Sequence, residues 1–220
     1  MGASRSQEES SRHEDVLLAP AQDAVAAVAR GEMVIVVDGE DRENEGDLVM
    51  AADLVTPEDV NFMITHGKGL VCVSLTEDRA RELDLPPMVQ QNEDHMGTAF
   101  TVSVDGSEQN GISTGISASE RARTIALLTS GTAEDLQRPG HVFPLVARNG
   151  GVLERQGHTE ASVDLARAAG RTPAGVIVEI VGPDGEMLRR DALADFAAQH
   201  ELVMTSIEAV REARSRGEVR

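Results

Sequence analysis

The sequence predicts a single three-layer α/β domain, of the mixed α+β kind, in which helices flank both faces of a mixed β-sheet. Helix-like and strand-like patterns alternate along most of its 220 residues, which favours a sheet covered by helices. Several strand candidates are apolar at successive positions, as expected of strands that are buried on both faces. One hairpin-like segment near the C-terminus breaks the alternation, so we expect a mixed sheet rather than a purely parallel one.

The first elements follow from local start and stop signals. Residues 21–30, AQDAVAAVAR, lie between a proline and a glycine and space Val and Ala for a helix with one buried face. The runs MVIVV (33–37) and LVMAA (48–52) predict two buried strands. The acidic stretch that separates these strands is therefore expected to be a loop.

The middle of the chain begins with a helix signal at Thr56. This residue is a candidate N-cap, followed by a proline and two acidic residues, so a helix is expected to run to about residue 66. LVCVSL (70–75) and TAFTVSV (98–104) are strand candidates, and SASERARTIALL (117–128) predicts a capped amphipathic helix.

Strand and helix signals continue to alternate after residue 140. HVFPLVAR (141–148) predicts a strand whose proline places it at an edge or a bulge. Thr159 is expected to cap a helix that Gly170 closes. AGVIVEIVG, the turn PDG and EMLR then predict a hairpin over 174–189. The last expected elements are a helix over 191–200, a short strand over 202–204 and a surface helix over 206–216.

Composition limits the classes of partner. With 38 acidic and 20 basic residues, the net charge of −18 repels polyanions and anionic membrane surfaces, so neither nucleic acid nor a membrane is an expected partner. A small phosphorylated substrate remains compatible, since helix N-termini and bound cations can reverse the local field. The single cysteine, Cys72, excludes an intrachain disulfide and fits a reducing cytoplasm.

The ends of the chain differ in character from its centre. The first 15 residues are polar and lack the apolar core of a signal peptide, and no run approaches the apolar length of a membrane span. We expect a disordered tail over 1–15, one domain over 16–214 and a C-terminal tail over 215–220.

The most unusual stretch is DGEDRENEGD (38–47), which places six carboxylates directly behind a buried strand. A solvated acidic turn is one interpretation, but like charges at this density repel unless something positive neutralises them. Arg42 supplies only one charge, whereas a divalent cation would supply two. An EF-hand is excluded because Ala52 occupies the twelfth loop position, where a bidentate Glu is needed. Oxygen ligands favour Mg²⁺ or Mn²⁺.

A second group of polar residues lies in RPGHVFPLVARNGGVLERQGHTEASVDL (138–165), where two histidines flank a glycine-rich turn. Arg155, Gly157, His158 and Thr159 fall at an expected helix start, where free N–H groups, a guanidinium and a hydroxyl would bind a phosphate. The alternative is an ordinary threonine cap. GISTGISASER, which contains Thr114, is a weaker candidate for substrate contact.

Two residues inside strand candidates also carry chemistry. Glu179 lies within GVIVEIV, where a buried carboxyl group needs a partner or acquires a raised pKa suited to proton transfer. Cys72 lies within LVCVSL and could equally be a small apolar residue.

Several long motifs together resemble one family. DGEDRENEGDLVMAAD, HGKGLVCVSL, GTAFTVSVD, GISTGISASERARTI, RPGHVFPLVARNGGVLERQGHTEASVDLARAAG and PAGVIVEI are similar, in order, to segments of 3,4-dihydroxy-2-butanone 4-phosphate synthase, an enzyme of riboflavin biosynthesis. The resemblance covers about residues 16–214. It implies a lyase that converts D-ribulose 5-phosphate to L-3,4-dihydroxybutan-2-one 4-phosphate and formate.

The resemblance also implies a role for each site residue. Glu43 and His158 would ligate a pair of Mg²⁺ or Mn²⁺ ions, and no organic cofactor would be needed. Arg155, Gly157 and Thr159 would contact the phosphate, with Arg42, Glu43, Asp47 and Thr114 as further substrate contacts. The residues implied in catalysis are Asp38, Glu45, Cys72, His141 and Glu179. Family members are homodimers with the active site at the subunit interface, so His141 and the acidic loop need not belong to one chain.

The sequence departs from the family pattern at Gln156, which stands where a small Gly or Ala is usual and bears on the shape of the phosphate loop. Some relatives continue into a GTP cyclohydrolase II domain, so the chain is either a stand-alone enzyme or a separated N-terminal half. Two alternatives stay open from sequence: a non-catalytic module that binds metal and phosphate on the same fold, and a different metal-dependent sugar-phosphate isomerase that releases no formate.

Overall fold

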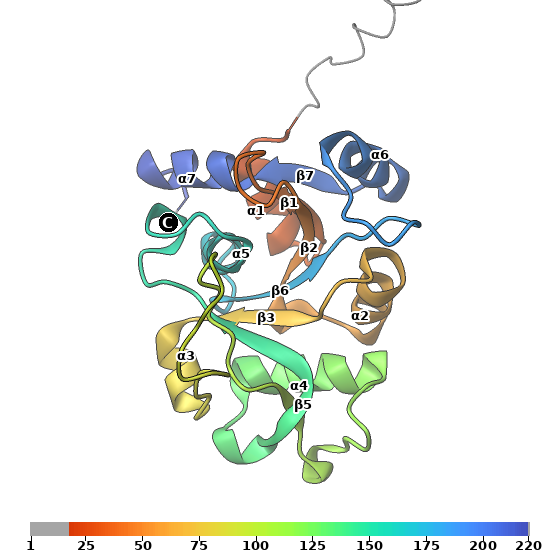
Figure 1. The fold of residues 1–220 in the computed structure, drawn as a ribbon, viewed down its shortest axis with the longest axis vertical. Coiled ribbons are helices and arrows are strands. Elements are labelled where there is room, and N and C mark those ends of the chain that lie inside the picture. The colour runs from red at the N-terminus through yellow and green to blue at the C-terminus, as the bar shows by residue number, and fades with distance from the viewer. Residues whose placement is uncertain (1–17, 220) are drawn as a thin grey trace, which may run out of the picture.

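Within residues 18–219, which the computed structural model describes, seven strands form one mixed sheet (Figure 1). The strands are β1 (Val34–Val37), β2 (Gly46–Ala51), β3 (Cys72–Leu75), β4 (Val104–Gly106), β5 (Leu136–Val146), β6 (Ala174–Glu179) and β7 (Val203–Ser206). Their order across the sheet is β4-β5-β3-β6-β2-β1-β7. The β1/β7 and β3/β5 pairs are parallel and the other neighbours are antiparallel, which confirms a mixed sheet.

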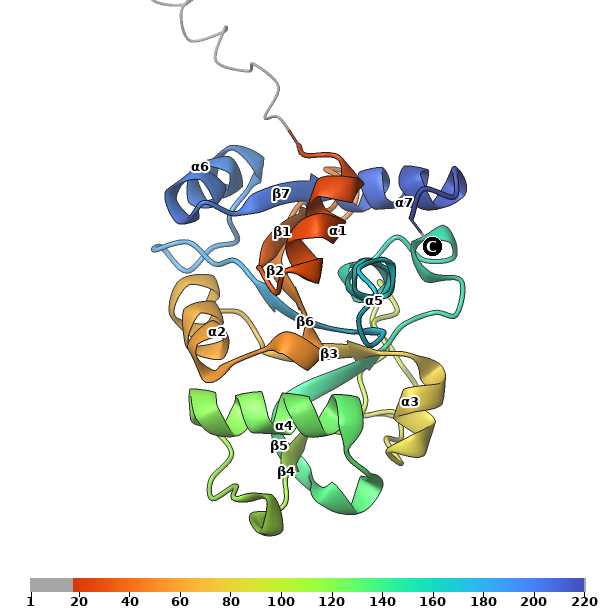
Figure 2. The same ribbon diagram turned by 180° about the vertical axis from the view of Figure 1, so that it is seen from behind.

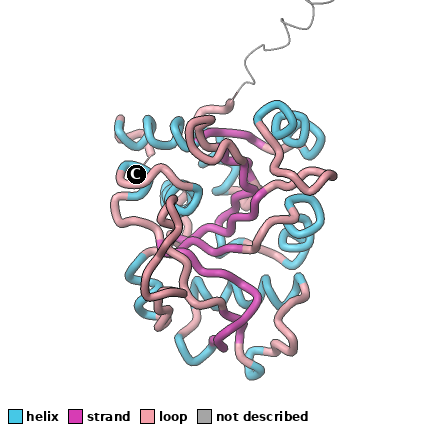
Figure 3. Tube along the Cα trace, in the orientation of Figure 1, coloured by secondary structure: helices cyan, strands magenta, loops and turns pink. Residues whose placement is uncertain are grey.

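Helices lie on both sides of this sheet. They are α1 (Ala21–Ala29), α2 (Pro57–Phe62), α3 (Glu77–Glu82), α4 (Ala118–Ser130), α5 (His158–Ala168), α6 (Arg190–His200) and α7 (Ile207–Ser215). Figures 1 and 2, which view the molecule from opposite directions, place α5 and α7 on one side and α2 and α6 on the other. In Figure 3 the strands form a continuous twisted band between these helices. None of the helices in the described part of the chain is long and apolar enough to cross a membrane.

The alternation of side chains along each strand divides the core into two clusters. In β1, Val34 and Val36 pack with residues of α1, α5 and α7, whereas Ile35 and Val37 pack with residues of α2, α4 and α6. All four side chains are buried because both faces of the sheet are covered. The two clusters confirm the predicted three-layer arrangement.

Several local signals act as expected. Thr56 caps α2 in a reciprocal capping box with Asp59, and a π-helical turn, Met63–Gly67, extends the helical path past residue 66. Ser206 accepts a hydrogen bond from the Ala209 N–H and caps α7. Gly170 ends α5 with a φ of +71°, a conformation that glycine adopts without strain.

The strand prediction for 98–104 is wrong except at Val104. Strand β4 begins there, and the preceding residues form only isolated bridges, from Phe100 to Leu145 and from Thr101 to Pro87. The reason lies in Pro144 of the facing strand. The Phe143 N–H donates to the Val71 carbonyl of the chain leading into β3, so the prolyl nitrogen faces residues 98–101 and has no hydrogen to donate to them.

The expected edge position of β5 is also wrong, since β5 lies between β4 and β3. The irregular register falls between Val104 and Asp105, whose partners are Val142 and Gln137, whereas Pro144 keeps regular register with Val73. The bulge therefore lies in the β4/β5 pair, several residues before the proline that suggested it.

The predicted cap of α5 is misplaced by two residues. The helix begins at His158 with Gly157 at the N-cap, and Thr159 is buried inside the first turn. Gly157 has a φ of −117°, which other residues also adopt, but a Cβ there would meet the Arg155 guanidinium and the Glu160 carboxylate. A larger side chain at 157 would therefore have to displace the ion pair between Arg155 and Glu160.

Three further differences concern short segments. Helix α3, capped by Thr76, is too short to stand out in the sequence. The predicted hairpin keeps its turn, but its returning arm pairs only through one bridge, from Val181 to Met187. The predicted tail over 1–15 lies outside the described residues, and Val219 is buried in the core cluster beside α7. We therefore propose 219, rather than 214, as the end of the packed domain.

Candidate active site

Strand register brings three of the predicted residues to the same face of the sheet. Asp47 in β2 lies directly opposite Glu179 in β6, and Cys72 in β3 lies opposite Ile177. By alternation, Asp47 shares a face with Val49, and Glu179 shares one with Ile177; both apolar residues pack in the cluster beneath α5. Polar groups from three neighbouring strands therefore meet under the start of that helix.

The acidic loop is organised around the carboxylate of Asp38. One of its oxygens accepts the Glu43 N–H at 2.8 Å, and the other accepts the Glu45 N–H at 2.8 Å. Arg42 donates to Asp38 at 3.0 Å and also contacts the Glu43 carboxylate. Asp38 is buried and does not line the cavity described below, so its oxygens hold the loop backbone.

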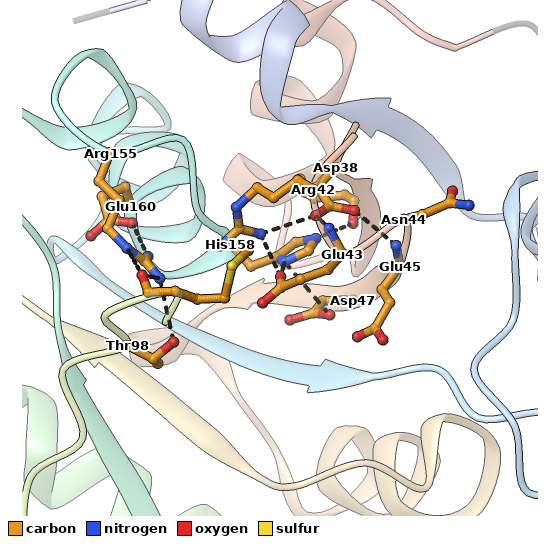
Figure 4. Close-up of polar contacts among 12 residues, drawn as sticks. Asp38, Arg42, Glu43, Asn44, Glu45, Asp47, Thr98, Arg155, His158 and Glu160 are labelled. Atoms are coloured by element: carbon orange, nitrogen blue, oxygen red, sulfur yellow. Dashed lines mark hydrogen bonds and ion pairs between the residues drawn. The ribbon is translucent and has the colours of Figure 1, made fainter. Parts of the chain in front are cut away.

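His158 is buried at the first position of α5 and faces the loop. Its Nε2 lies 3.2 Å from the Val36 carbonyl oxygen, which can only accept, so Nε2 carries a proton. Its Nδ1 then faces Glu43 Oε2 at 3.7 Å and Asp47 Oδ1 at 4.0 Å (Figure 4). The backbone of β1 thus fixes the ring with Nδ1 toward the carboxylates.

Burial and crowding shift the pKa values of these groups apart. Burial raises the pKa of Asp47 to about 7 against the opposing charge of His158. Burial alone would lower the pKa of His158, but the charges of Asp47 and Glu43 outweigh it and raise this pKa to about 9. The contact with His158 lowers the pKa of Glu43, whereas burial raises those of Glu45 and the Cys72 thiol. Near neutral pH, the cluster contains both proton donors and proton acceptors.

These side chains surround a cavity of about 120 Å³. Of the predicted site residues, the lining includes Arg42, Glu43, Glu45, Asp47, Cys72, Arg155, His158, Thr159 and Glu179. Thr98, Phe100, Leu145 and Ile177 complete it. Most of the predicted site is therefore brought together within one chain, although its members come from a loop, three strands and a helix start.

Arg155 lies on the other side of the cavity from the acidic loop (Figure 4). Its Nη1 donates to Glu160 at 2.6 Å, its Nε and Nη2 donate to the Met96 carbonyl, and Nη2 also donates to Thr98. Glu160 is buried and accepts the Arg148 N–H as well. The N-terminus of α5 lies beside this guanidinium, and both are groups that could bind an anion at this end of the cavity.

Gln156, which stands where the family usually has a small Gly or Ala, lies outside the cavity lining. Its side chain is exposed, whereas Gly157 and Thr159 on either side of the helix start are buried. The residue that departs from the family pattern therefore points to solvent and leaves the cavity lining unchanged.

Two predicted residues lie elsewhere in the chain. His141 is held by Asp105, which accepts from its backbone N–H at 2.9 Å and faces its Nδ1 at 2.7 Å. Thr114 lies in a turn that Glu120 organises by accepting the N–H groups of Ser113 and Gly115. Neither His141 nor Thr114 lines the cavity. With Nδ1 turned to Asp105, the His141 ring is half-exposed, and its Nε2 has no hydrogen-bond partner among residues 18–219.

Glu43 and His158 are the pair that could hold a divalent cation. Within residues 18–219, no three His, Cys, Asp or Glu side chains are already gathered as a metal site. Two donors suffice for Mg²⁺, which keeps several water ligands at about 2.0 to 2.1 Å. Octahedral donors at that distance lie about 3.0 Å apart when adjacent and about 4.2 Å apart when opposite. The observed 3.7 Å between Glu43 Oε2 and His158 Nδ1 is longer than the adjacent-donor distance by about 0.7 Å, so a small movement of the Glu43 side chain would bring both atoms to adjacent positions on one ion.

Sequence reasoning missed three residues that support the site. Glu160 and Asp105 orient Arg155 and His141, and Arg189 donates to backbone carbonyls of the acidic loop. Asp105 and Arg189 lie 36 and 146 residues from their partners, farther than a local motif spans, whereas Glu160 lies only five residues from Arg155. For Glu160 a signal existed, since an acidic residue in the first helical turn beside a candidate anion site needs a cationic partner once it is buried.

Known proteins are similar to this chain over most of its length. The family model for 3,4-dihydroxy-2-butanone 4-phosphate synthase matches residues 22–213. A riboflavin biosynthesis protein RibBA from Aquifex aeolicus is 54% identical over 210 residues, covering 94% of this chain and 52% of that protein. A 3,4-dihydroxy-2-butanone 4-phosphate synthase from Photobacterium phosphoreum is 48% identical over 203 residues, covering 91% of this chain and 55% of that protein. The chain thus spans about half of the length of these curated relatives.

Solved structures agree with the fold. A crystal structure of 3,4-dihydroxy-2-butanone 4-phosphate synthase in complex with two magnesium ions has a TM-score of 0.87 and 43% identity, covering 91% of this chain and 99% of that one. A two-domain synthase of this name from A. baumannii has a TM-score of 0.84 and 49% identity, covering 87% of this chain and 56% of that one. The chain belongs to the 3,4-dihydroxy-2-butanone 4-phosphate synthase family.

Proposed function

We propose that this chain is a metal-dependent lyase of riboflavin biosynthesis that converts D-ribulose 5-phosphate to L-3,4-dihydroxybutan-2-one 4-phosphate and formate. The observation that carries the proposal is the cavity itself. Its lining includes Glu43 and His158, which we propose as the cation ligands, and Arg155 and Thr159, which we propose as the phosphate contacts. A sugar phosphate presents the matching groups, hydroxyl and carbonyl oxygens at one end and a phosphate at the other.

The reaction needs charge stabilisation and several proton transfers, and its atoms balance without a co-substrate. A divalent cation held by Glu43 and His158 would act as a Lewis acid for negative charge on the substrate oxygens. Asp47, with a pKa of about 7, is suited to accept and return a proton near neutral pH, and Glu45 and Glu179 face the same space. The raised pKa of Cys72 keeps its thiol protonated, so we assign it a contact or donor role rather than that of a thiolate nucleophile.

We also propose a homodimer in which each cavity is completed by the second copy. His141 and Thr114 belong to the expected site but lie outside the cavity of their own chain, and His141 presents Nε2 outward. A two-fold dimer would bring the corresponding surface of each chain to the other cavity, forming two equivalent sites. The free, buried cysteine is compatible with the cytoplasm, which we propose as the location.

The test is formate release from ribulose 5-phosphate, measured with Mg²⁺ and then with excess EDTA. We expect formate only with the metal, and loss of turnover in Glu43→Gln and His158→Ala with the fold intact. Asp41→Asn is the matched control, because Asp41 is an exposed acid of the same loop that lies outside the cavity lining. Full activity in either cavity variant would sink the metal assignment.

Other outcomes would support other functions. Tight metal binding without turnover would indicate a binding module, and a new sugar phosphate formed without formate would indicate an isomerase. The cavity favours the lyase over a binding module, because binding alone does not require Asp47 and Glu179 to face each other across β2 and β6.

A further inference from the structure

Arg189 contacts the acidic loop from a distant part of the chain. Its Nη1 donates to the Glu43 carbonyl at 2.9 Å and to the Asn44 carbonyl at 2.5 Å, although 146 and 145 residues separate these partners in sequence. Arg190, the next residue, approaches the Asp38 carbonyl at 3.5 Å. Two arginines at the start of α6 therefore face the backbone of a loop that carries six carboxylates.

The start of α6 is itself fixed against the strand that leaves the loop. Leu193, one turn into the helix, is buried over Gly46, where an added Cβ would lie only 2.7 Å from Leu193 Cδ1. The Ile180 N–H also donates to the Gly46 carbonyl at 3.0 Å. Because Arg189 is the N-cap residue of α6, this packing sets where its guanidinium can reach.

The backbone of the acidic loop turns sharply at Asn44, next to the two carbonyls that Arg189 contacts. Asn44 has a φ of +54°, which is uncommon for a residue other than glycine, and its side chain points away from the other labelled groups in Figure 4. This reversal directs the carbonyls of Glu43 and Asn44 to the same guanidinium. A guanidinium is weakly hydrated and keeps its charge, so it suits a pair of carbonyl acceptors better than an ammonium does.

We propose that Arg189 is a positioning residue for the metal-binding end of the site. It holds the backbone of Glu43 so that the carboxylate stays 3.7 Å from His158 Nδ1, and it links the loop to α6. This inference rests on the proposed function for its catalytic consequence, but its structural part concerns the metal-free protein. Asp38 accepts hydrogen bonds from the loop backbone and from Arg42 on the buried side, and Arg189 donates to the loop backbone on the exposed side.

The experiment compares Arg189→Ala, Arg189→Lys and the control Arg211→Ala. Arg211 is a partly exposed arginine of α7 that pairs with Glu208 of its own helix, so the control removes the same charge away from the loop. Amide hydrogen exchange over residues 39–45 is measured in EDTA, and Mn²⁺ binding is measured by electron paramagnetic resonance. Thermal unfolding checks that each variant is folded.

In Arg189→Ala we expect exchange in the loop to rise by about three- to tenfold, because the guanidinium is exposed and water can replace part of what its hydrogen bonds contribute. Mn²⁺ binding should weaken by roughly 10- to 100-fold, as for other residues that orient metal ligands. Arg189→Lys should recover part of both effects, and Arg211→Ala should match the wild type. Loop exchange or Mn²⁺ affinity of Arg189→Ala within about twofold of the wild type would overturn the proposal.

Formate release separates this inference from the proposed function. If the wild type releases no formate, the proposed function fails, while exchange and Mn²⁺ binding still decide the role of Arg189. If the wild type is active, turnover of Arg189→Ala at limiting Mg²⁺ should fall and recover in part at high Mg²⁺. Equal loss at every Mg²⁺ concentration would contradict a positioning role.

Discussion

Replacing Asp38 with asparagine tests whether this residue organises the acidic loop or acts on the substrate. The side chain is only 1% exposed and its two oxygens accept the N–H groups of Glu43 and Glu45, each at 2.8 Å. Asparagine keeps the shape but replaces one accepting oxygen with an NH₂ group. One of the two N–H groups then loses its partner, and Arg42 loses a buried counter-charge.

The magnitude follows from the unpaired N–H group. A buried donor without an acceptor costs about 1 to 3 kcal/mol, which corresponds to an increase of about 5- to 150-fold in the opening equilibrium of the loop. Arg42 keeps its contact with the Glu43 carboxylate, so the lost charge of Asp38 adds little to this range. We therefore expect the Glu43 and Glu45 amides to exchange about 5- to 150-fold faster in Asp38→Asn.

The assay is hydrogen exchange by nuclear magnetic resonance in EDTA, with Asp41→Asn as control. Asp41 is an exposed acid of the same loop, so its variant has the same change in charge without the buried hydrogen bonds. Unchanged exchange in Asp38→Asn, or an equal increase in the control, would refute the argument. If turnover is lost while the exchange rates stay unchanged, Asp38 acts in catalysis, as expected from the family resemblance.

Four further predictions test separate features. In metal-free protein, the wild type should have a higher Tm than His158→Asn below pH 6.5, and this difference should decrease as the pH rises toward 9. The reason is that the raised pKa of His158 means that its protonation stabilises the folded state. A Tm difference that does not change with pH would contradict this. Gly46→Ala should lower the free energy of unfolding in urea by about 1 to 3 kcal/mol through its clash with Leu193, and unchanged stability would show that α6 yields. Gln156→Gly should leave formate release within about twofold, since the side chain is exposed, and a larger change would mean that it shapes the phosphate site. Mixing inactive His141→Ala and His158→Ala chains under conditions of subunit exchange should restore about a quarter of wild-type activity. Half of the dimers then contain one chain of each kind, and each such dimer has one intact site out of two. No recovery of activity would mean that both residues belong to a site within one chain.

The fold was predictable wherever local pattern and tertiary environment agree. Runs such as VIVV in β1 are apolar throughout because helices cover both faces, and this pattern is visible in sequence. The failed strand prediction has a non-local cause. Residues 98–103 have good strand composition, but the partner strand presents Pro144 at the point where pairing would continue. Thr159 is a good capping residue, but the helical hydrogen bonds begin with the Gly157 carbonyl, which accepts the Ala161 N–H, so Thr159 falls inside the first turn.

The candidate site divides in the same way. Its acidic loop and helix start were predictable, because the density of charge at 38–47 and the grouping at 155–159 are local. Their meeting around one cavity depends on the antiparallel pairing of β2 with β6, which no single segment specifies. The supporting contact of Arg189 spans 146 residues and joins an arginine to backbone carbonyls, so it leaves no signature in residue type at its partners.

Cys72 has a practical consequence for work with this protein. It is the only cysteine of the chain, it is 3% exposed, and burial raises its thiol pKa. Alkylating reagents act on exposed thiolates, so the native thiol should react slowly at neutral pH. A cysteine introduced at the exposed position of Asp41 could then be labelled selectively with a fluorophore or spin probe. The natural sequence already provides the background needed to follow the acidic loop by spectroscopy.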